Sequence, residues 1–370
     1  MRFDFADLLL DVLDRRASDL HITAGSHPMV RVRGRLTPLD EYPMLDATET
    51  REIVYSILSN DQRQRLETEW QLDFAYSIPG RARFRVNAYF QRGALGAAFR
   101  LIPAQITPID DLGLPPVVHE LCKKPRGIVL VTGPTGSGKS TTLASMVDEI
   151  NATREEHILT IEDPIEFLHG HRKCMVNQRE IGADAHSFAA GLKAALREDP
   201  DVILVGEMRD LDTISTALTA AETGHLVFAT LHTQSAPSTI DRVIDVFPAH
   251  QQQQIRVQLS IALQGVITQT LIPTADGAGR AVACEILVPT AAVRNLIREG
   301  KTHQILSSMQ TGSGVGMQSM DTALAALVRS GKITQRVAEA RSDTPDELRR
   351  ILGASSFGGG GAGGNYGMAA

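Results

Sequence analysis

The sequence predicts an α/β chain in which a larger domain, built on a buried parallel sheet, follows a smaller α+β domain. Two observations lead to this expectation. Residues 1–100 mix short helical and strand-like patterns, whereas from Gly127 onward continuous apolar runs alternate with helix-patterned segments. Apolar runs separated by helices are typical of parallel strands that are buried on both faces. A length of 370 residues leaves room for about two domains.

The composition is that of an ordinary globular protein, with 43% hydrophobic and 22% charged residues. The formal net charge of -6 gives no basic excess, and basic residues do not cluster with aromatic ones, which argues against a nucleic acid partner. The three cysteines, Cys122, Cys174 and Cys284, are widely spaced. They exclude a four-cysteine zinc site, argue against a disulfide framework and fit a reducing compartment.

The N-terminal residues predict a helix and not a targeting signal. Leu8, Leu9 and Val12 share one helical face, and aspartates interrupt the apolar stretch, unlike the core of a signal peptide. No apolar run approaches the ~18 residues of a membrane span. We therefore expect a cytoplasmic protein without a transmembrane segment.

The rest of the first domain is predicted to combine strands with one more helix. Apolar residues and arginines alternate over 30–36, a strand pattern with turns at Gly25 and Gly34. Residues 48–68 have helical spacing, with isoleucines on one side and charges on the other. Three more strand-like runs follow at 73–78, 81–91 and 94–103.

The second domain should contain the parallel sheet. Its predicted strands lie within 127–133, 157–163, 201–207 and 225–232, and its predicted helices at 139–151, 187–198 and 210–222, with a mainly helical region over 235–352. The expected boundaries are a domain over 1–101, a linker with four prolines over 102–116, a domain over 117–352 and a flexible glycine-rich tail over 353–370.

The strongest motif is GPTGSGKST at 133–141, which matches the phosphate-binding pattern GxxxxGK[ST] in full. Its glycines let backbone N–H groups approach phosphates, and the following helix directs the positive end of its dipole at the anion. In this pattern Lys139 reaches the β- and γ-phosphates, and the Ser140 hydroxyl binds Mg²⁺. The predicted nucleotide-binding residues are Gly133, Pro134, Thr135, Gly136, Ser137, Gly138, Lys139, Ser140 and Thr141.

Carboxylates follow two of the other predicted strands. Glu207 ends the apolar run 201–207, where a parallel strand would place a ligand for Mg²⁺, although a solvated glutamate is the plainer interpretation. Glu162, Asp163 and Glu166 follow an earlier strand, and a carboxylate there could polarise an attacking water. The pattern does not choose among these three.

Histidines and arginines complete the candidate set. His225 and His232 flank an apolar strand, and a histidine at its carboxyl end could sense a γ-phosphate, although a lone histidine is more often a core or capping residue. Arg83 and Arg85 share one strand face, which is either a solvated edge or the source of an arginine finger, in its own subunit or a neighbour's. The candidate arginines of the first domain, outside the P-loop region, are Arg83, Arg85, Arg92 and Arg100.

Four motifs, in chain order, resemble the Walker A, Asp box, Walker B and His box of the secretion ATPase superfamily, which are hexameric RecA-like motors: GPTGSGKSTT, TIEDPIEF, LREDPDVILVGEMRD and TGHLVFATLHT. SDLHITAG and RFRVN resemble the N-terminal domain of that family, and AVRNLIREGK at 292–301 is similar to a motif of its pilus retraction ATPases. The resemblance covers nearly the whole chain. It implies a RecA-like P-loop NTPase core with a smaller N-terminal α+β domain of PAS-like type.

The resemblance also implies a role for each candidate. Glu166 would be the general base, Glu207 would hold Mg²⁺ with Ser140, and His232, in preference to His225, would contact the γ-phosphate. The arginines implied to reach the nucleotide are Arg85 and Arg100, and those implied to lie near the subunit boundary are Arg197 and Arg209. The residues implied to serve retraction without binding ATP are Arg294, Asn295, Leu296 and Arg298.

The implied protein is a homohexameric ATPase that uses ATP and Mg²⁺ to drive type IV pilus retraction and twitching motility. It would be recruited to the inner face of the cytoplasmic membrane at the pilus machine, with an inner-membrane platform protein and a second retraction ATPase as partners. A pilus assembly or type II secretion ATPase, an accessory retraction ATPase, a DNA translocase and a nucleotide-gated regulator are the alternatives. The missing four-cysteine element and the short chain argue against the assembly and secretion types. The complete set of site residues argues against a regulator that barely hydrolyses ATP.

Overall fold

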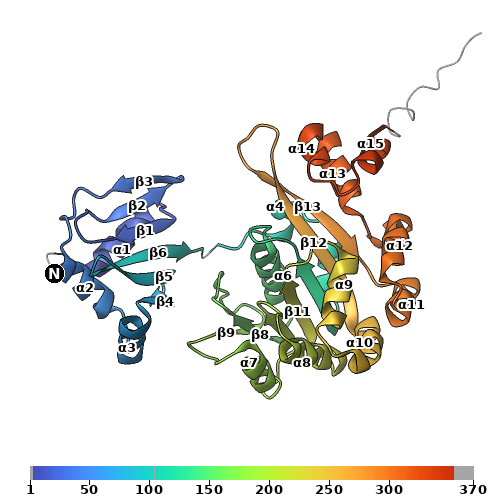
Figure 1. The fold of residues 1–370 in the computed structure, drawn as a ribbon, viewed down its shortest axis with the longest axis horizontal. Coiled ribbons are helices and arrows are strands. Elements are labelled where there is room, and N and C mark those ends of the chain that lie inside the picture. The colour runs from blue at the N-terminus through green and yellow to red at the C-terminus, as the bar shows by residue number, and fades with distance from the viewer. Residues whose placement is uncertain (1–2, 104, 354–370) are drawn as a thin grey trace, which may run out of the picture. The chain divides into compact units, whose positions relative to one another are not determined.

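The computed structural model describes residues 3–103 and 105–353 and divides the chain into two units (Figure 1). Unit 1 comprises residues 1–105 together with the short segment 164–168, and unit 2 comprises the remainder. The described residues contain no helix with the length and apolar composition that a membrane span requires. The predicted tail over 353–370 lies outside the described residues, except for Gly353 at the end of a helix.

Unit 1 is an antiparallel sheet with three helices. Its strands occur in the order β3-β2-β1-β6-β5-β4. They are β1 (Asp19–Ile22), β2 (Met29–Val32), β3 (Arg35–Pro38), β4 (Gln71–Ile78), β5 (Ala82–Gln91) and β6 (Ala94–Ile102). The helices are α1 (Phe5–Asp14), α2 (Ala47–Ser56) and α3 (Asn60–Glu69). The predicted α+β character of this region is therefore confirmed.

Strand alternation places the core of unit 1 on one face of its sheet. Phe84 and Val86 on β5 are fully buried and belong to the same hydrophobic cluster as Leu8 and Leu9 on α1. Each such apolar side chain stabilises the fold by about 1.5–3 kcal/mol when it leaves water. The intervening residue of β5, Arg85, is exposed on the other face. The helix predicted at the N-terminus is thus confirmed, as is the two-sided strand that carries the arginines.

Two predicted elements of unit 1 are divided in the structure. The single helix expected over 48–68 is wrong, because Ser59 starts a new helix: its side chain accepts from the backbone N–H of Gln62, and the Gln62 side chain accepts from that of Ser59. The strand pattern over 30–36 is a hairpin. Its turn at Gly34 was predicted, and both turn residues, Arg33 and Gly34, have positive φ of 49° and 82°, as tight hairpin turns require.

Unit 2 contains a second sheet in the order β13-β12-β7-β11-β10-β8-β9, in which only the pair β12–β13 is antiparallel. The strands are β7 (Gly127–Thr132), β8 (His157–Glu162), β9 (Met175–Glu180), β10 (Val202–Val205), β11 (Leu226–Leu231), β12 (Leu263–Pro273) and β13 (Arg280–Leu287). Its helices are α4 (Ile109–Leu112), α5 (Val117–Cys122), α6 (Lys139–Thr153), α7 (Phe188–Ala195), α8 (Leu211–Glu222), α9 (Ala236–Asp245), α10 (Ala249–Ala262), α11 (Ala291–Glu299), α12 (Ile305–Thr311), α13 (Met320–Arg329), α14 (Gln335–Glu339) and α15 (Pro345–Gly353). Two 3₁₀ turns, η1 (Thr302–Gln304) and η2 (Ser313–Val315), complete the unit. The predicted α/β fold with a buried parallel sheet is confirmed.

Three strands of this sheet were not predicted. The expectation of helices through 235–352 is wrong for β12 and β13, and β9 was also missed. Strand β12 begins at Leu263, directly after α10 ends at Ala262, so no glycine or proline marks the change from helix to strand. The β-branched run of Val266, Ile267 and Thr268 within β12 is the signal that favoured a strand.

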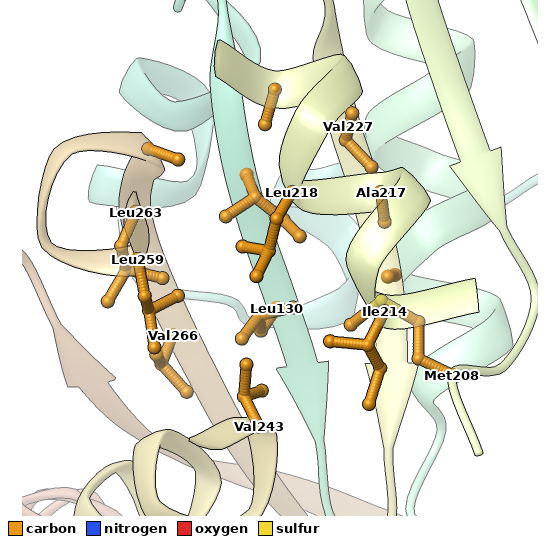
Figure 2. Packing of buried hydrophobic residues seen from close by; sticks show 14 of the residues in the cluster. Leu130, Met208, Ile214, Ala217, Leu218, Val227, Val243, Leu259, Leu263 and Val266 are labelled. Carbon is orange, nitrogen blue, oxygen red and sulfur yellow. The ribbon is translucent and has the colours of Figure 1, made fainter. Parts of the chain in front are cut away.

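Alternate residues of β7 pack into two different cores. Leu130 faces a cluster that includes Ile214 and Leu218 of α8 and Leu259 of α10 (Figure 2). Val131, the next residue, packs into a second cluster with α5 and α6 residues. Because both faces of the sheet are covered, side chains that do chemistry in unit 2 are confined to the loops at the strand ends.

Candidate functional site

The phosphate-binding motif connects the buried strand β7 to α6, as the sequence predicts. Strand β7 ends at Thr132 and α6 begins at Lys139. The Lys139 ammonium is buried over this loop, where it donates to the backbone oxygens of Gly133 at 2.8 Å and Pro134 at 3.1 Å. These two backbone oxygens are neutral acceptors, which a charged phosphate oxygen can replace as partners of the ammonium.

Two glycines of the loop are required by its geometry. Gly133 has a φ of 136°, and a Cβ there would lie 2.3 Å from the backbone oxygen of Gln269. Gly138 has a φ of 91° and occupies the N-cap of α6 without a side-chain cap. The first N–H groups of this 15-residue helix therefore meet no capping side chain, and the positive end of the helix dipole is available to an anion.

Strand β12 supports the loop from the side, through a residue that the sequence analysis missed. Gln269 is 1% exposed and donates from Nε2 to the backbone oxygen of Ser137 at 2.8 Å. Within the described residues, the buried Ser137 Oγ and Gln269 Oε1 have no hydrogen-bond partner. The signal in the sequence that could have identified Gln269 was its amide side chain within an otherwise apolar run. The unsatisfied Ser137 hydroxyl can donate to a phosphate oxygen, and beside the uncapped helix and the lysine it fits a loop that binds phosphate groups.

The sheet register brings three candidate segments to one edge. Strand β11 lies between β7 and β10, with Leu231 opposite Thr132 and Ala229 opposite Val205. The P-loop, His232 and Glu207 therefore follow the carboxyl ends of three adjacent parallel strands. In open α/β sheets this edge is where ligands bind.

Glu207 is held by an arginine and lies beside a histidine. Arg209 donates from Nε and Nη2 to the two carboxylate oxygens at 2.5 and 2.6 Å, and His232 Nε2 lies 3.1 Å from Oε1. Burial raises the pKa of Glu207, but the Arg209 hydrogen bond and the nearby His232 outweigh it, so that the pKa lies below its usual range. The carboxylate is thus ionised at neutral pH, in the state that binds a cation.

The carboxylates after β8 occupy different environments. Glu162 ends the strand, and its Oε1 accepts from Thr160 Oγ1 at 2.6 Å and Gln178 Nε2 at 3.0 Å. Asp163 and Glu166 are exposed. Glu166 lies in the segment 164–168, which belongs to unit 1, whereas Lys139 belongs to unit 2.

His225 lies at the opposite edge of the sheet from the P-loop. It precedes Leu226, which pairs with Gly127 at the start of β7, and its Nδ1 lies 3.0 Å from the backbone oxygen of Ala220 near the end of α8. Six strand residues at ~3.3 Å each put roughly 20 Å between the two edges. His225 therefore caps α8, whereas His232 follows the strand end beside the P-loop.

The candidate arginines are distributed over both units. Arg85 and Arg100 lie directly opposite each other on β5 and β6 in unit 1, whereas the P-loop belongs to unit 2. Arg92 has a φ of 49° in the turn between these strands. Arg197 is exposed just after α7, whereas Arg209 is bound to Glu207.

The motif 292–301 forms α11, which packs on α10. Arg294 donates to the backbone oxygens of Ser260 and Ile261, the second at 2.9 Å, and so caps the end of α10. The other polar residues of the motif bond along the helix, Asn295 to Glu299 at 2.7 Å and Arg298 to Asn295 at 3.2 Å. Leu296 is half-buried against the main core of unit 2.

Metal ligands were sought across the described residues as well. No group of three or more histidine, cysteine, aspartate or glutamate side chains there could hold a metal ion. A hydroxyl and one carboxylate, Ser140 and Glu207, are the donors that the motif offers. This small donor set fits Mg²⁺, which usually keeps several waters and takes its other ligands from substrate phosphates.

Comparisons with known proteins agree with this fold. The chain matches the family described as Type II/IV secretion system protein over residues 4–339. It is 51% identical, over 345 residues, to the type IV pilus retraction ATPase PilT of Pseudomonas aeruginosa, covering 93% of this chain and 100% of that protein. It is 40% identical to the type IV pilus ATPase PilU of the same organism, covering 94% of this chain and 91% of that protein.

A solved structure is similar over the same extent. The crystal structure of the pilus retraction motor PilT with bound ADP superposes with a TM-score of 0.88 at 50% identity, covering 94% of this chain and 99% of that one. The chain therefore belongs to the Type II/IV secretion system protein family.

Proposed function

We propose that this member of the secretion ATPase family is an ATP-hydrolysing motor that drives type IV pilus retraction and twitching motility. The observation that carries the proposal is 51% identity to a retraction ATPase along that protein's whole length, against 40% to PilU. The loop between β7 and α6, with its uncapped helix and folded-back lysine, supports nucleotide binding. So does the ADP in the similar crystal structure.

The phosphate chain of ATP would lie on residues 133–141. Backbone N–H groups of the loop bind its oxygens, and the Lys139 ammonium leaves the Gly133 and Pro134 oxygens for the β- and γ-phosphates. The Ser140 hydroxyl and the Glu207 carboxylate hold Mg²⁺, which neutralises phosphate charge when it is bound. Arg209 keeps Glu207 ionised and oriented before the ion arrives.

The remaining candidate side chains complete the chemistry. Glu166 takes the proton of the attacking water as general base, and His232 contacts the γ-phosphate while it remains beside Glu207. Arg85 and Arg100 stabilise the charge on the transferred phosphoryl group, from their own subunit or from a neighbour's. Arg197 and Arg209 are proposed to lie near the boundary between subunits of a homohexamer. His225 is far from the P-loop of its own chain, so any catalytic role for it would be at a neighbour's site.

Hydrolysis would be coupled to movement through ligand-dependent closure. A state that binds ATP more tightly is favoured while ATP is present and is released after hydrolysis. Successive closures around the ring would move an inner-membrane platform protein at the cytoplasmic membrane, and α11 with Arg294, Asn295, Leu296 and Arg298 would transmit the movement. A PilU-like paralogue is a further proposed partner. The proposed functional division keeps 1–101 as the arginine-bearing domain, 102–116 as linker, 117–352 as the ATPase domain and 353–370 as a tail.

The test is deletion of the gene in its host, with surface pili counted by electron microscopy and twitching scored on agar. Many pili without twitching is the expected result, since a retraction motor removes pilin from the fibre. Few or no pili would contradict it and indicate an assembly ATPase. An unchanged count with normal twitching would contradict a principal role in retraction.

A substitution in α11 separates hydrolysis from retraction. Leu296→Ala should keep ATP hydrolysis within twofold of the parent while the complemented strain fails to twitch, because this half-buried residue lies on α11 and not on the P-loop edge. Loss of hydrolysis in this variant would show that α11 belongs to the folding core or to the site.

A further inference from the structure

A row of charged residues crosses the sheet of unit 1 on the face opposite its core. The register places Arg85 of β5 opposite Arg100 of β6, Arg100 opposite Asp19 of β1, and Asp19 opposite Arg31 of β2. Four side chains from four adjacent strands therefore lie side by side. Three are arginines, and Asp19 is the single carboxylate of the row.

Asp19 is fixed more firmly than the arginines around it. It is 8% exposed, and its two oxygens accept from different donors: Arg100 Nε at 2.9 Å on Oδ1, and Ser18 Oγ at 2.7 Å on Oδ2. Arg31 Nε lies 3.8 Å from Oδ2. Burial raises the pKa of Asp19, but these hydrogen bonds and the Arg100 charge outweigh it and lower the pKa. The carboxylate therefore stays ionised and in place.

Arg100 has the opposite character, since its side chain is 73% exposed. The guanidinium carries five N–H donors, and the contact with Asp19 uses only the one on Nε. Within the described part of the chain, Nη1 and Nη2 of Arg100 make no hydrogen bond. Its outer edge, with two nitrogens in one plane, is the edge that binds two oxygens of a phosphate.

We propose that Asp19 is a positioning residue that holds Arg100 by its Nε atom, so that the Nη1 and Nη2 edge is presented to a phosphate oxygen of the nucleotide. This inference rests on the proposed function, in which Arg100 contacts ATP. Arg31 and Ser18 support this arrangement, because they remain partners of the buried Asp19 carboxylate when Arg100 binds a phosphate.

The physical advantage is preorganisation. A free arginine on a strand samples many rotamers and must be ordered when the phosphate reacts, whereas Arg100 begins with its inner nitrogen bound. Ordering one long side chain corresponds to roughly a 2- to 12-fold change in an equilibrium or rate. The gain should appear in kcat, since arginine fingers act on charge that develops in the transition state.

A double-mutant cycle on the full-length protein tests the proposal. We expect Arg100→Ala to lower the kcat of ATP hydrolysis by roughly 100-fold or more. Asp19→Asn keeps the shape and removes the charge, and it should lower kcat about fivefold with KM changed less than twofold. The double variant should match Arg100→Ala alone, because Asp19 acts only through Arg100. Arg35→Ala, on an exposed arginine of β3 outside the row, is the matched control and should have no effect.

Each other outcome overturns the inference in a distinguishable way. A fivefold loss from Asp19→Asn that persists in the Arg100→Ala background would mean that Asp19 serves only the fold. A normal kcat for Asp19→Asn together with a lowered kcat for Arg100→Ala would contradict the positioning role of Asp19 and leave the role of Arg100 as an arginine finger unchanged. A normal kcat for Arg100→Ala would contradict both the arginine-finger role of Arg100 and the positioning role of Asp19. If Asp19→Asn does not fold, Ser18→Ala replaces it in the cycle, with a loss of about twofold expected only when Arg100 is present.

Discussion

The two sheets of this protein place their chemistry in different ways. Both faces of the unit 2 sheet are covered, and neighbouring residues of β7, such as Leu130 and Val131, enter separate cores. Its reactive groups lie at strand ends, in the P-loop and at Glu207. The unit 1 sheet has its core on one side, so the other face of β5 and β6 carries arginines in register. A sheet that is covered on both faces leaves only its strand ends for functional side chains, whereas a sheet that is covered on one face can also present them on the other.

The largest effect on ATP hydrolysis should follow from a substitution in the P-loop, at the carboxyl-end edge of the unit 2 sheet. Lys139→Ala removes the ammonium from the loop and should lower kcat/KM for ATP hydrolysis by at least about 100-fold, because a charged donor to the phosphates is lost. Steady-state hydrolysis checks the loss, and circular dichroism checks that the fold remains. Turnover near that of the parent would contradict the assignment of this edge as the site.

Substitutions at two adjacent residues of β5 can distinguish the core face of the unit 1 sheet from its arginine-bearing face. Phe84→Ala should lower the free energy of unfolding by about 3–5 kcal/mol, because Phe84 is fully buried beside Phe99. Arg85→Ala, one residue later, should change it by less than about 0.5 kcal/mol and yet reduce hydrolysis. Urea unfolding and ATPase assays on both variants give the comparison. Equal destabilisation by the two would mean that the arginine face is also part of the core.

The smallest effect concerns the helices that cover one face of the unit 2 sheet. His119 on α5 lies between Glu149 Oε2 at 2.7 Å and Asp110 Oδ1 at 3.0 Å, and the Glu149 hydrogen bond raises the pKa of His119 above its usual range. Its contribution should be fully present below about pH 6.5, the unfolded value, and be lost as the pH rises through the higher folded value. The expected size is no more than about 1 kcal/mol, since the group is partly solvated.

Thermal unfolding between pH 6 and pH 9 measures this effect, with His119→Gln as the variant. The stability difference between parent and variant should shrink as the pH rises. A difference that does not change with pH would contradict the charge-dependent role of His119.

The P-loop could be predicted from the sequence because its requirements are local. Its glycines, its lysine and the flanking strand and helix all lie within the continuous segment 127–153, and Gly133 and Gly138 indeed adopt positive φ. The candidate Glu207 was also found from a strand end. The break at Ser59 was visible as a capping box, yet the continuous helical spacing around it concealed the boundary.

The contacts that could not be predicted join residues far apart in the chain. Gln269 supports Ser137 across more than 100 positions, and Asp19 binds Arg100 because β1 pairs with β6. His225 and His232 were expected at the two ends of one strand, and its pairing with β7 places only the end that precedes His232 beside the P-loop. Residue order specifies local conformation and which side chains can bind phosphate. Strand pairing specifies which of them meet, because hydrogen-bond register depends on partners that no short segment contains.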